Sequence, residues 1–118
     1  MLDHIGLRTT QFDTLVAFYK ATLATLGYGL VMEFPGAVGF GRVTPDFCIG
    51  AADATSSVHL AFVAASRAEV DAFYSAAISQ GATGNGPPGK RDYTPNYYAA
   101  FVLDPDGNNI EVVCHAPA

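Results

Sequence analysis

The sequence predicts an α+β domain built from two copies of one βαβββ module. The first observation is a repeat with a period of 55 residues, in which His4 and His59 are each followed, at the same distance, by an Ala-Phe-Tyr segment. The second is that strand-like and helix-like hydrophobic patterns follow each other in the same order in both halves. The third is the length, since 118 residues suit one domain. We therefore expect a single domain over 1–118, with modules at about 1–54 and 55–118.

The first half of the chain is expected to form one strand, one helix and three further strands. Hydrophobic residues alternate over 2–8, which predicts a strand, and take helical spacing over 12–26. Gly27 follows as a suitable helix stop. Three short β-prone runs, separated by turns rich in Pro and Gly, are then expected at 28–34, 37–43 and 47–51.

The second half repeats this order. The segment from Ser66 to Glu69 is a capping box, which predicts a helix that runs to about Gln80. The Gly- and Pro-rich segment 83–96 replaces a clean strand, and we expect an irregular substrate loop there. The sequence Asp-Pro-Asp-Gly favours a tight turn between the last two strands. The strands of this half are expected at 58–64, 97–104 and 108–114.

Composition argues against several classes of protein. The net charge of −5, with only six Lys and Arg residues, argues against binding to nucleic acid, whose phosphates attract clustered cations. No apolar run is long enough for a membrane span, and no signal peptide is expected at the N-terminus. Cys48 and Cys114 lack CxxC spacing and suit a reduced, cytoplasmic protein. The hydrophobic share of 50% favours a homodimer that covers part of the surface.

Three side chains that can bind a metal are predicted on strand faces that point away from the helices. His4 shares its strand face with Gly6, and His59 shares its face with Ala61. Glu111 interrupts the apolar run of the last strand, where a carboxylate is costly to bury without a positive partner. Two imidazoles and one carboxylate can hold a divalent cation and leave positions open for substrate. The alternatives are hydrogen-bonded core histidines and an ion pair between Glu111 and an arginine.

The segments around these residues resemble the vicinal oxygen chelate superfamily. They are Asp3–Leu7, His59–Phe62 and Asp104–Glu111. This superfamily includes glyoxalase I, extradiol dioxygenases, fosfomycin resistance transferases and bleomycin-binding proteins. The resemblance implies paired βαβββ modules and a metal held by the first strand of each module and by the last strand, here at His4, His59 and Glu111. In several single-domain members the site is completed across a dimer, so His4 could meet His59 and Glu111 of the partner subunit.

One departure concerns the reaction. Glyoxalase I enzymes usually supply a fourth ligand from the last strand of the first module, where this chain offers only Cys48, which we interpret as a buried structural thiol. The resemblance then favours a dioxygenase, or a thiol-transferase or lyase, that acts on a small oxygen-bearing substrate with Fe, Mn, Ni or Zn. Isomerisation of the lactoylglutathione lyase type is one alternative. A metal-free protein that binds a small molecule such as an antibiotic is the other.

Further polar residues are candidates for contact with the substrate. Those for substrate binding are Arg8, Lys90 and Arg91. Those for catalysis are Tyr93, Tyr97 and Tyr98, because a tyrosine can orient a substrate or donate a proton. Since Tyr97 and Tyr98 begin a strand, one should face the cleft and the other the core. Ordinary surface or packing roles are the alternative for each, and His115 in the terminal tail is expected to have no function.

Overall fold

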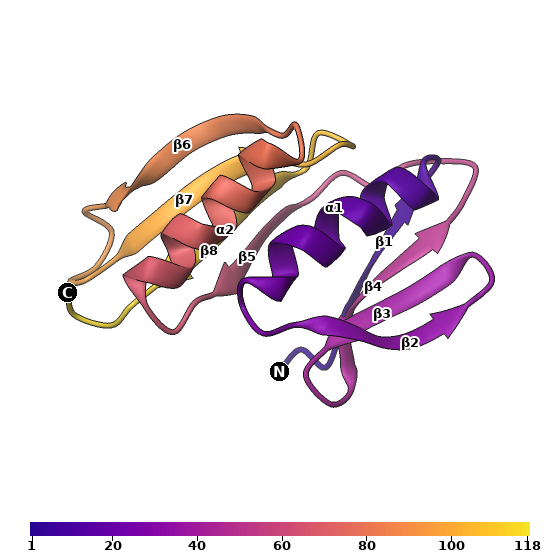
Figure 1. The fold of residues 1–118 in the computed structure, drawn as a ribbon, viewed down its shortest axis with the longest axis horizontal. Coiled ribbons are helices and arrows are strands. Elements are labelled where there is room, and N and C mark those ends of the chain that lie inside the picture. The colour runs from indigo at the N-terminus through magenta and orange to yellow at the C-terminus, as the bar shows by residue number, and fades with distance from the viewer.

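The computed structural model describes residues 1–118 and confirms two βαβββ modules (Figure 1). The elements of the first module are β1 (Ile5–Thr9), α1 (Phe12–Ala24), β2 (Gly29–Phe34), β3 (Ala37–Gly41) and β4 (Pro45–Ala51). Those of the second are β5 (His59–Val63), α2 (Arg67–Ser79), β6 (Thr83–Lys90), β7 (Tyr98–Leu103) and β8 (Asn109–Cys114). Neither helix has the length and apolar composition needed to cross a membrane.

Each module forms its own four-stranded sheet with the same topology. The strand orders are β1-β4-β3-β2 and β5-β8-β7-β6, and in each sheet the first strand runs parallel to the last one of the module. Gly6 lies opposite Cys48 in the first sheet, and Ala61 lies opposite Glu111 in the second. Because Gly6 and Ala61 each follow their repeated histidine by two positions, Cys48 occupies in the first module the place that Glu111 occupies in the second.

Local signals in the sequence explain where the helices begin and end. Ser66 caps α2, since its hydroxyl accepts the N–H of Glu69 at 3.2 Å, and the Glu69 carboxylate accepts the N–H of Ala65 at 2.6 Å. Gly27 and Gly81 follow the two helices with φ of 77° and 88°, a left-handed conformation that glycine adopts without steric cost.

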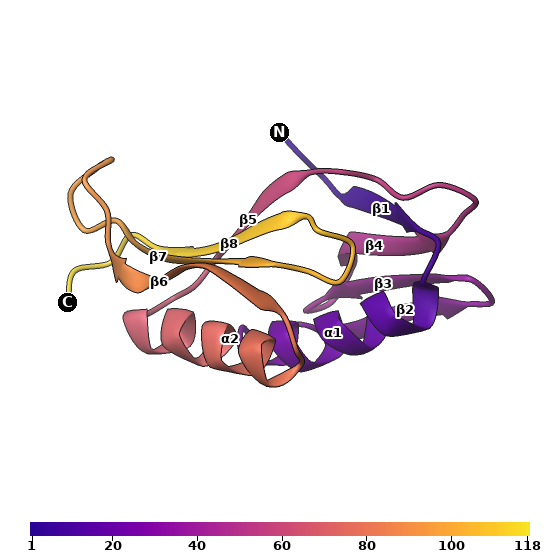
Figure 2. The ribbon, with the colours of Figure 1, turned by 90° about the horizontal axis from the view of Figure 1, so that it is seen from above.

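The two modules share one hydrophobic core. Both helices lie on the same side of the molecule (Figure 2), and α1 contacts α2. Phe47 of the first module meets Phe62 of the second, with ring centroids 5.3 Å apart. The hydroxyl of Tyr19 on α1 donates a hydrogen bond of 2.5 Å to Asp104 in the β7–β8 turn. Tyr19 and Asp104 therefore join the modules through a buried polar contact as well as through apolar packing.

The structure corrects two predictions. The first eight residues of the segment expected to be an irregular loop form β6. The prolines Pro87 and Pro88 are tolerated because β6 is an edge strand that pairs only with β7, with irregularities in the pairing on both sides of Gly86. The second correction is at the N-terminus, where β1 begins at Ile5, so His4 precedes the strand on which it was expected.

Candidate metal centre

His59 and Glu111 lie next to each other on the open face of the second sheet. His59 begins β5, Glu111 is in the middle of the neighbouring β8, and the His59 Nε2 atom is 3.3 Å from the Glu111 Oε1 atom. The side chain of His59 is half exposed, whereas that of Glu111 is only 5% exposed. Leu60 and Ile110, on the opposite face, pack into the core. The structure thus brings together two of the three predicted ligands.

The orientation of the His59 ring is determined by two contacts. Its Nδ1 atom is 2.9 Å from the carbonyl oxygen of Asn109, and because a carbonyl can only accept, Nδ1 is the nitrogen that donates. The ring also stacks on Phe101, with centroids 6.3 Å apart and an interplanar angle of 21°. Nε2 is therefore the nitrogen directed at Glu111, in the arrangement commonly found for metal-binding histidines.

The carboxylate of Glu111 forms no ion pair with a lysine or an arginine. The ion pairs of the chain both involve histidines, so the alternative of a pair between Glu111 and an arginine is wrong. The Glu111 Oε2 atom accepts a hydrogen bond from the Tyr97 hydroxyl. This hydrogen bond, together with partial burial, raises the pKa of Tyr97 to about 12, so the hydroxyl is a stable donor at neutral pH.

The geometry of this pair fits a divalent metal ion. Nε2 without a proton and the carboxylate Oε1 are both acceptors, so at 3.3 Å they need a positive charge between them, either a proton or a cation. Two ligand atoms that each lie about 2.1 Å from one ion are roughly 3.0–3.4 Å apart at octahedral or tetrahedral angles. The spacing of the His59 and Glu111 atoms lies in this range.

His4 is not part of this pair within one chain. Its side chain is exposed and its Nδ1 atom is 2.7 Å from the Asp3 carboxylate. Together with Met32, Pro45 and Cys48 it lines a separate cavity of about 430 Å³ on the first module. No group of three or more His, Cys, Asp or Glu side chains in the chain is arranged to hold a metal ion.

Cys48 lines the same cavity as His4 and is half-buried. Burial raises the pKa of its thiol, and the nearby Asp46 raises it further. The side chain is therefore a neutral thiol at physiological pH, and it stands where the second module has a carboxylate. It is not paired with Cys114, which is buried elsewhere.

Other side chains contact Phe101 and Tyr97, the two residues that touch the His59–Glu111 pair. The guanidinium of Arg91 lies over the Phe101 ring at 5.6 Å and donates to the carbonyl of Pro87 at 2.9 Å. Tyr93 and His115 each pack edge-on against Tyr97, at 5.0 and 5.1 Å. Phe101 was not among the residues predicted for the site, and His115, for which no function was expected, packs against Tyr97. The hairpin register, which places Phe101 opposite Glu111, is the signal that could have identified Phe101.

The remaining candidates lie elsewhere. Tyr97 faces the open side of the sheet, whereas the Tyr98 hydroxyl donates to Asp71 on α2 at 2.7 Å. The two tyrosines therefore point to opposite faces of the sheet, and this position separates Tyr98 from Glu111. Arg8 is exposed on β1 of the first module, and Lys90 ends β6 with an exposed side chain.

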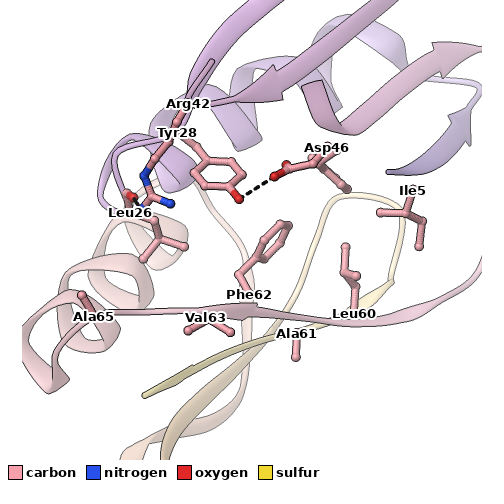
Figure 3. Close-up of a pocket in the computed structure, with 11 residues that line it drawn as sticks. Ile5, Leu26, Tyr28, Arg42, Asp46, Leu60, Ala61, Phe62, Val63 and Ala65 are labelled. Carbon is pink, nitrogen blue, oxygen red and sulfur yellow. Dashed lines mark hydrogen bonds between the residues drawn. The ribbon is translucent and has the colours of Figure 1, made fainter. Parts of the chain in front are cut away.

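A cavity of about 460 Å³ between the modules was not predicted (Figure 3). Most of its lining is apolar, with Ile5 on one side and Phe62 on the other. Its polar groups are paired with each other. The Tyr28 hydroxyl donates to Asp46 at 2.7 Å, and Arg42 lies over the Tyr28 ring. The cavity contains none of the predicted metal ligands.

Known proteins share this sequence pattern and fold. The family model of the glyoxalase/bleomycin resistance protein/dioxygenase superfamily matches residues 1–112. A glyoxalase/bleomycin resistance protein from Albidiferax ferrireducens is 30% identical, with a TM-score of 0.82 and 97% of both chains covered. A glyoxalase/bleomycin resistance protein/dioxygenase family enzyme from Burkholderia phytofirmans is 22% identical, with a TM-score of 0.77 and 98% of both chains covered.

A fosfomycin resistance protein from Listeria monocytogenes has the same fold at 19% identity, with a TM-score of 0.74 over 98% of this chain and 93% of the other. None of the curated proteins matches the chain. The family model spans nearly the whole sequence, and the paired modules are those that the resemblance implies. The chain therefore belongs to the glyoxalase/bleomycin resistance protein/dioxygenase superfamily.

Proposed function

We propose that the protein is a metal-dependent enzyme of this superfamily that acts on a small oxygen-bearing substrate. The pair of His59 and Glu111 is the observation that carries the proposal. A buried carboxylate without a lysine or arginine partner lies 3.3 Å from an imidazole nitrogen, and the ring is oriented by the hydrogen bond of its other nitrogen to the Asn109 carbonyl. A divalent ion between the two would satisfy both acceptors. Fe, Mn, Ni and Zn all accept ligands of these types.

We infer that the third ligand, His4, comes from a second copy of the chain. Within one chain His4 lies on the other module, and no third ligating group is near the pair. The two modules have the same topology, so the open face of one can oppose the open face of the other in a symmetric homodimer. Such a dimer would place His4 beside His59 and Glu111 of the partner subunit.

The chain's own side chains suggest how the substrate is held. A bound metal would supply Lewis acidity toward adjacent substrate oxygens. Arg91, with its guanidinium anchored to the Pro87 carbonyl, would attract an anionic group along the wall formed by Phe101. Arg8 and Lys90 could add positive charge at the margins. Tyr97 and Tyr93 could orient the substrate beside the carboxylate of Glu111.

The reaction that we favour is that of a dioxygenase, or of a thiol-transferase or lyase. Isomerisation of the lactoylglutathione lyase type uses paired carboxylates as proton carriers, and this chain has Cys48 in the place of the second one. A thiol whose pKa is raised by burial is a poor substitute for a carboxylate base. The free thiols also suit the reducing cytoplasm, where we expect the protein to act.

A metal-free binding protein is the second candidate. The observation that favours it is the apolar cavity of about 460 Å³ between the modules, which is large enough for a small organic molecule. In this case the open sheet faces would serve the assembly, and His59 and Glu111 would contact each other without a metal ion.

Metal loading of the purified protein tests the proposal. The wild type is supplied separately with Fe²⁺, Mn²⁺, Ni²⁺ and Zn²⁺ and analysed for bound metal by mass spectrometry. We expect binding by the wild type, and its loss in His59→Ala and Glu111→Gln. Glu33→Gln is the matched control, because it removes an exposed carboxylate on β2 of the other module and is not a proposed ligand. Failure of the wild type to bind any of the four ions would refute the enzyme proposal and favour the binding protein.

Mixing two defective variants tests the shared site. Neither His4→Ala nor Glu111→Gln should hold metal alone, but a heterodimer of the two contains one intact site. An equal mixture, refolded or exchanged to equilibrium, should recover about a quarter of the wild-type sites. A site within one chain would recover none.

Loaded protein is then assayed with catechols, with epoxides plus a thiol, and with methylglyoxal–glutathione adducts. Turnover of the last substrate would overturn the argument from Cys48.

A further inference from the structure

We propose that Tyr97 is a positioning residue for metal binding, which holds one oxygen of Glu111 so that only the other faces His59. The inference rests on the metal site proposed above. The Tyr97 hydroxyl donates to Oε2 of Glu111, whereas Oε1 is the oxygen 3.3 Å from the His59 Nε2 atom. The two oxygens of one carboxylate thus have separate partners. One is occupied by a hydrogen bond, and the other is left for a cation.

Tyr97 is itself held in place from several sides. Its ring lies edge-on to Tyr93 and His115, with interplanar angles of 88° for both pairs. Its backbone carbonyl accepts the N–H of Arg91 at 2.8 Å, and its N–H donates to the carbonyl of Thr94 at 3.3 Å. These contacts fix the hydroxyl relative to β8, although Tyr97 precedes β7 and lies at the margin of the sheet.

Without this hydroxyl the carboxylate of Glu111 would be free to turn. The glutamate side chain has three rotatable bonds, and Tyr97 is the only side chain that donates a hydrogen bond to it. A rotation would move Oε1 away from His59 or present both oxygens to the ion. Partners that orient metal ligands in this way typically contribute about 10–100-fold to metal affinity.

The next residue offers a matched control. Tyr98 has the same chemistry and also donates to a carboxylate, that of Asp71, at 2.7 Å. It lies on the helix side of the sheet, with Arg67 stacked over its ring at 5.0 Å. Tyr98→Phe therefore removes an equivalent hydrogen bond in the same part of the fold without touching Glu111.

The experiment compares Tyr97→Phe and Tyr98→Phe in the full chain. Zn²⁺ affinity is measured by competition with a chromogenic chelator, Co²⁺ is used as a spectroscopic probe of the ligand set, and thermal unfolding is followed without metal. For Tyr97→Phe we expect Zn²⁺ affinity to fall about 10–100-fold and the Co²⁺ ligand-field bands to shift. For Tyr98→Phe we expect the wild-type affinity and spectrum, whatever its unfolding temperature.

The outcomes separate this inference from the proposed function. If the wild type binds Zn²⁺ and Tyr97→Phe binds it equally well, the positioning role is wrong while the metal site stands. If Tyr98→Phe weakens binding as much as Tyr97→Phe, the effect is a general loosening of the fold and the inference is also wrong. If the wild type binds neither Zn²⁺ nor Co²⁺, the proposed function fails and the inference fails with it.

Discussion

Replacing Tyr19 with phenylalanine tests how strongly the two modules are joined. Tyr19 on α1 is fully buried, and its hydroxyl donates to the Asp104 carboxylate at 2.5 Å. The same carboxylate accepts the N–H of Asp106 at 2.9 Å, the N–H of Asn108 at 2.9 Å and the side-chain amide of Asn108 at 2.8 Å. Phenylalanine removes only the hydroxyl and keeps the ring contact with Phe47. The change therefore isolates one hydrogen bond between the modules.

The size of the expected loss in unfolding free energy follows from the charge of Asp104 and from the burial of the hydrogen bond. A hydrogen bond to a charged group contributes about 1.5–3 kcal/mol. Because Asp104 retains three other hydrogen-bond donors in the variant, we expect the unfolding free energy to fall by about 2 kcal/mol at pH 7. Burial, and then the charge of Asp104, raise the pKa of Tyr19 well above the ordinary value for tyrosine. The hydroxyl thus stays protonated in the folded protein at pH values where it ionises in the unfolded chain.

The stabilisation that Tyr19 provides should decrease at high pH. A group whose pKa is raised by folding stabilises the fold below its unfolded pKa and loses this contribution as the pH rises toward the folded one. With an unfolded pKa of about 10, the contribution of the Tyr19 hydroxyl to the unfolding free energy should fall by about 1.4 kcal/mol between pH 7 and pH 11. The difference in unfolding free energy between wild type and Tyr19→Phe should therefore narrow from about 2 to below about 1 kcal/mol.

Urea unfolding at pH 7 and pH 11, followed by circular dichroism, measures both differences. Tyr28→Phe serves as the control at pH 7, because its hydroxyl also donates to a carboxylate, that of Asp46, but is only half-buried. We expect its cost to be below about 1 kcal/mol. A cost below about 0.5 kcal/mol for Tyr19→Phe at pH 7, or a difference that does not narrow at pH 11, would refute the reasoning.

Two further substitutions test local features. Gly86 has a φ of +148°, and a Cβ atom there would lie 3.1 Å from the Phe101 ring, so we expect Gly86→Ala to lower the unfolding free energy by about 1–2 kcal/mol. Gly50→Ala, with no atom within 4 Å of its Cβ, should stay within about 0.5 kcal/mol, and equal costs would contradict the steric argument. Ser66→Ala should cost about 1 kcal/mol in thermal or urea unfolding by removing the cap of α2. The exposed mid-helix Ser75→Ala should not destabilise, and a similar loss there would dissociate the effect from capping.

Most of the fold could be predicted because its signals are local. Alternation, helical spacing, the capping box and glycine stops all act over a few residues, and the repeat shows them twice. β6 could not be predicted in this way, because Pro87 and Pro88 oppose a strand by local rules. What makes the segment a strand is its pairing with β7, and its position at the sheet edge is a property of the tertiary structure.

The candidate site could likewise be predicted only in part. The proximity of His59 and Glu111 follows from the parallel pairing of β5 with β8. The resemblance had implied it, by assigning both residues as ligands of one metal. The contact between Tyr97 and Glu111 depends on how two long side chains meet across strands, which residue patterns do not specify. In the proposed homodimer the position of His4 would depend on which sheet faces meet, and residue patterns do not specify this.

The repeat and the structure together explain why the two modules should contribute differently to a site. The two modules have equivalent backbones but different residues at equivalent positions. Cys48 lies opposite Gly39 in the first sheet, and Glu111 lies opposite Phe101 in the second. In the second module the carboxylate of Glu111 is held by burial, and the ring of His59 is held by stacking on Phe101. In the first module the corresponding positions carry a thiol and a glycine, and His4 has only the neighbouring Asp3 to hold it. We therefore expect the second module to determine metal affinity, and the first to supply one imidazole and the space in which a substrate lies.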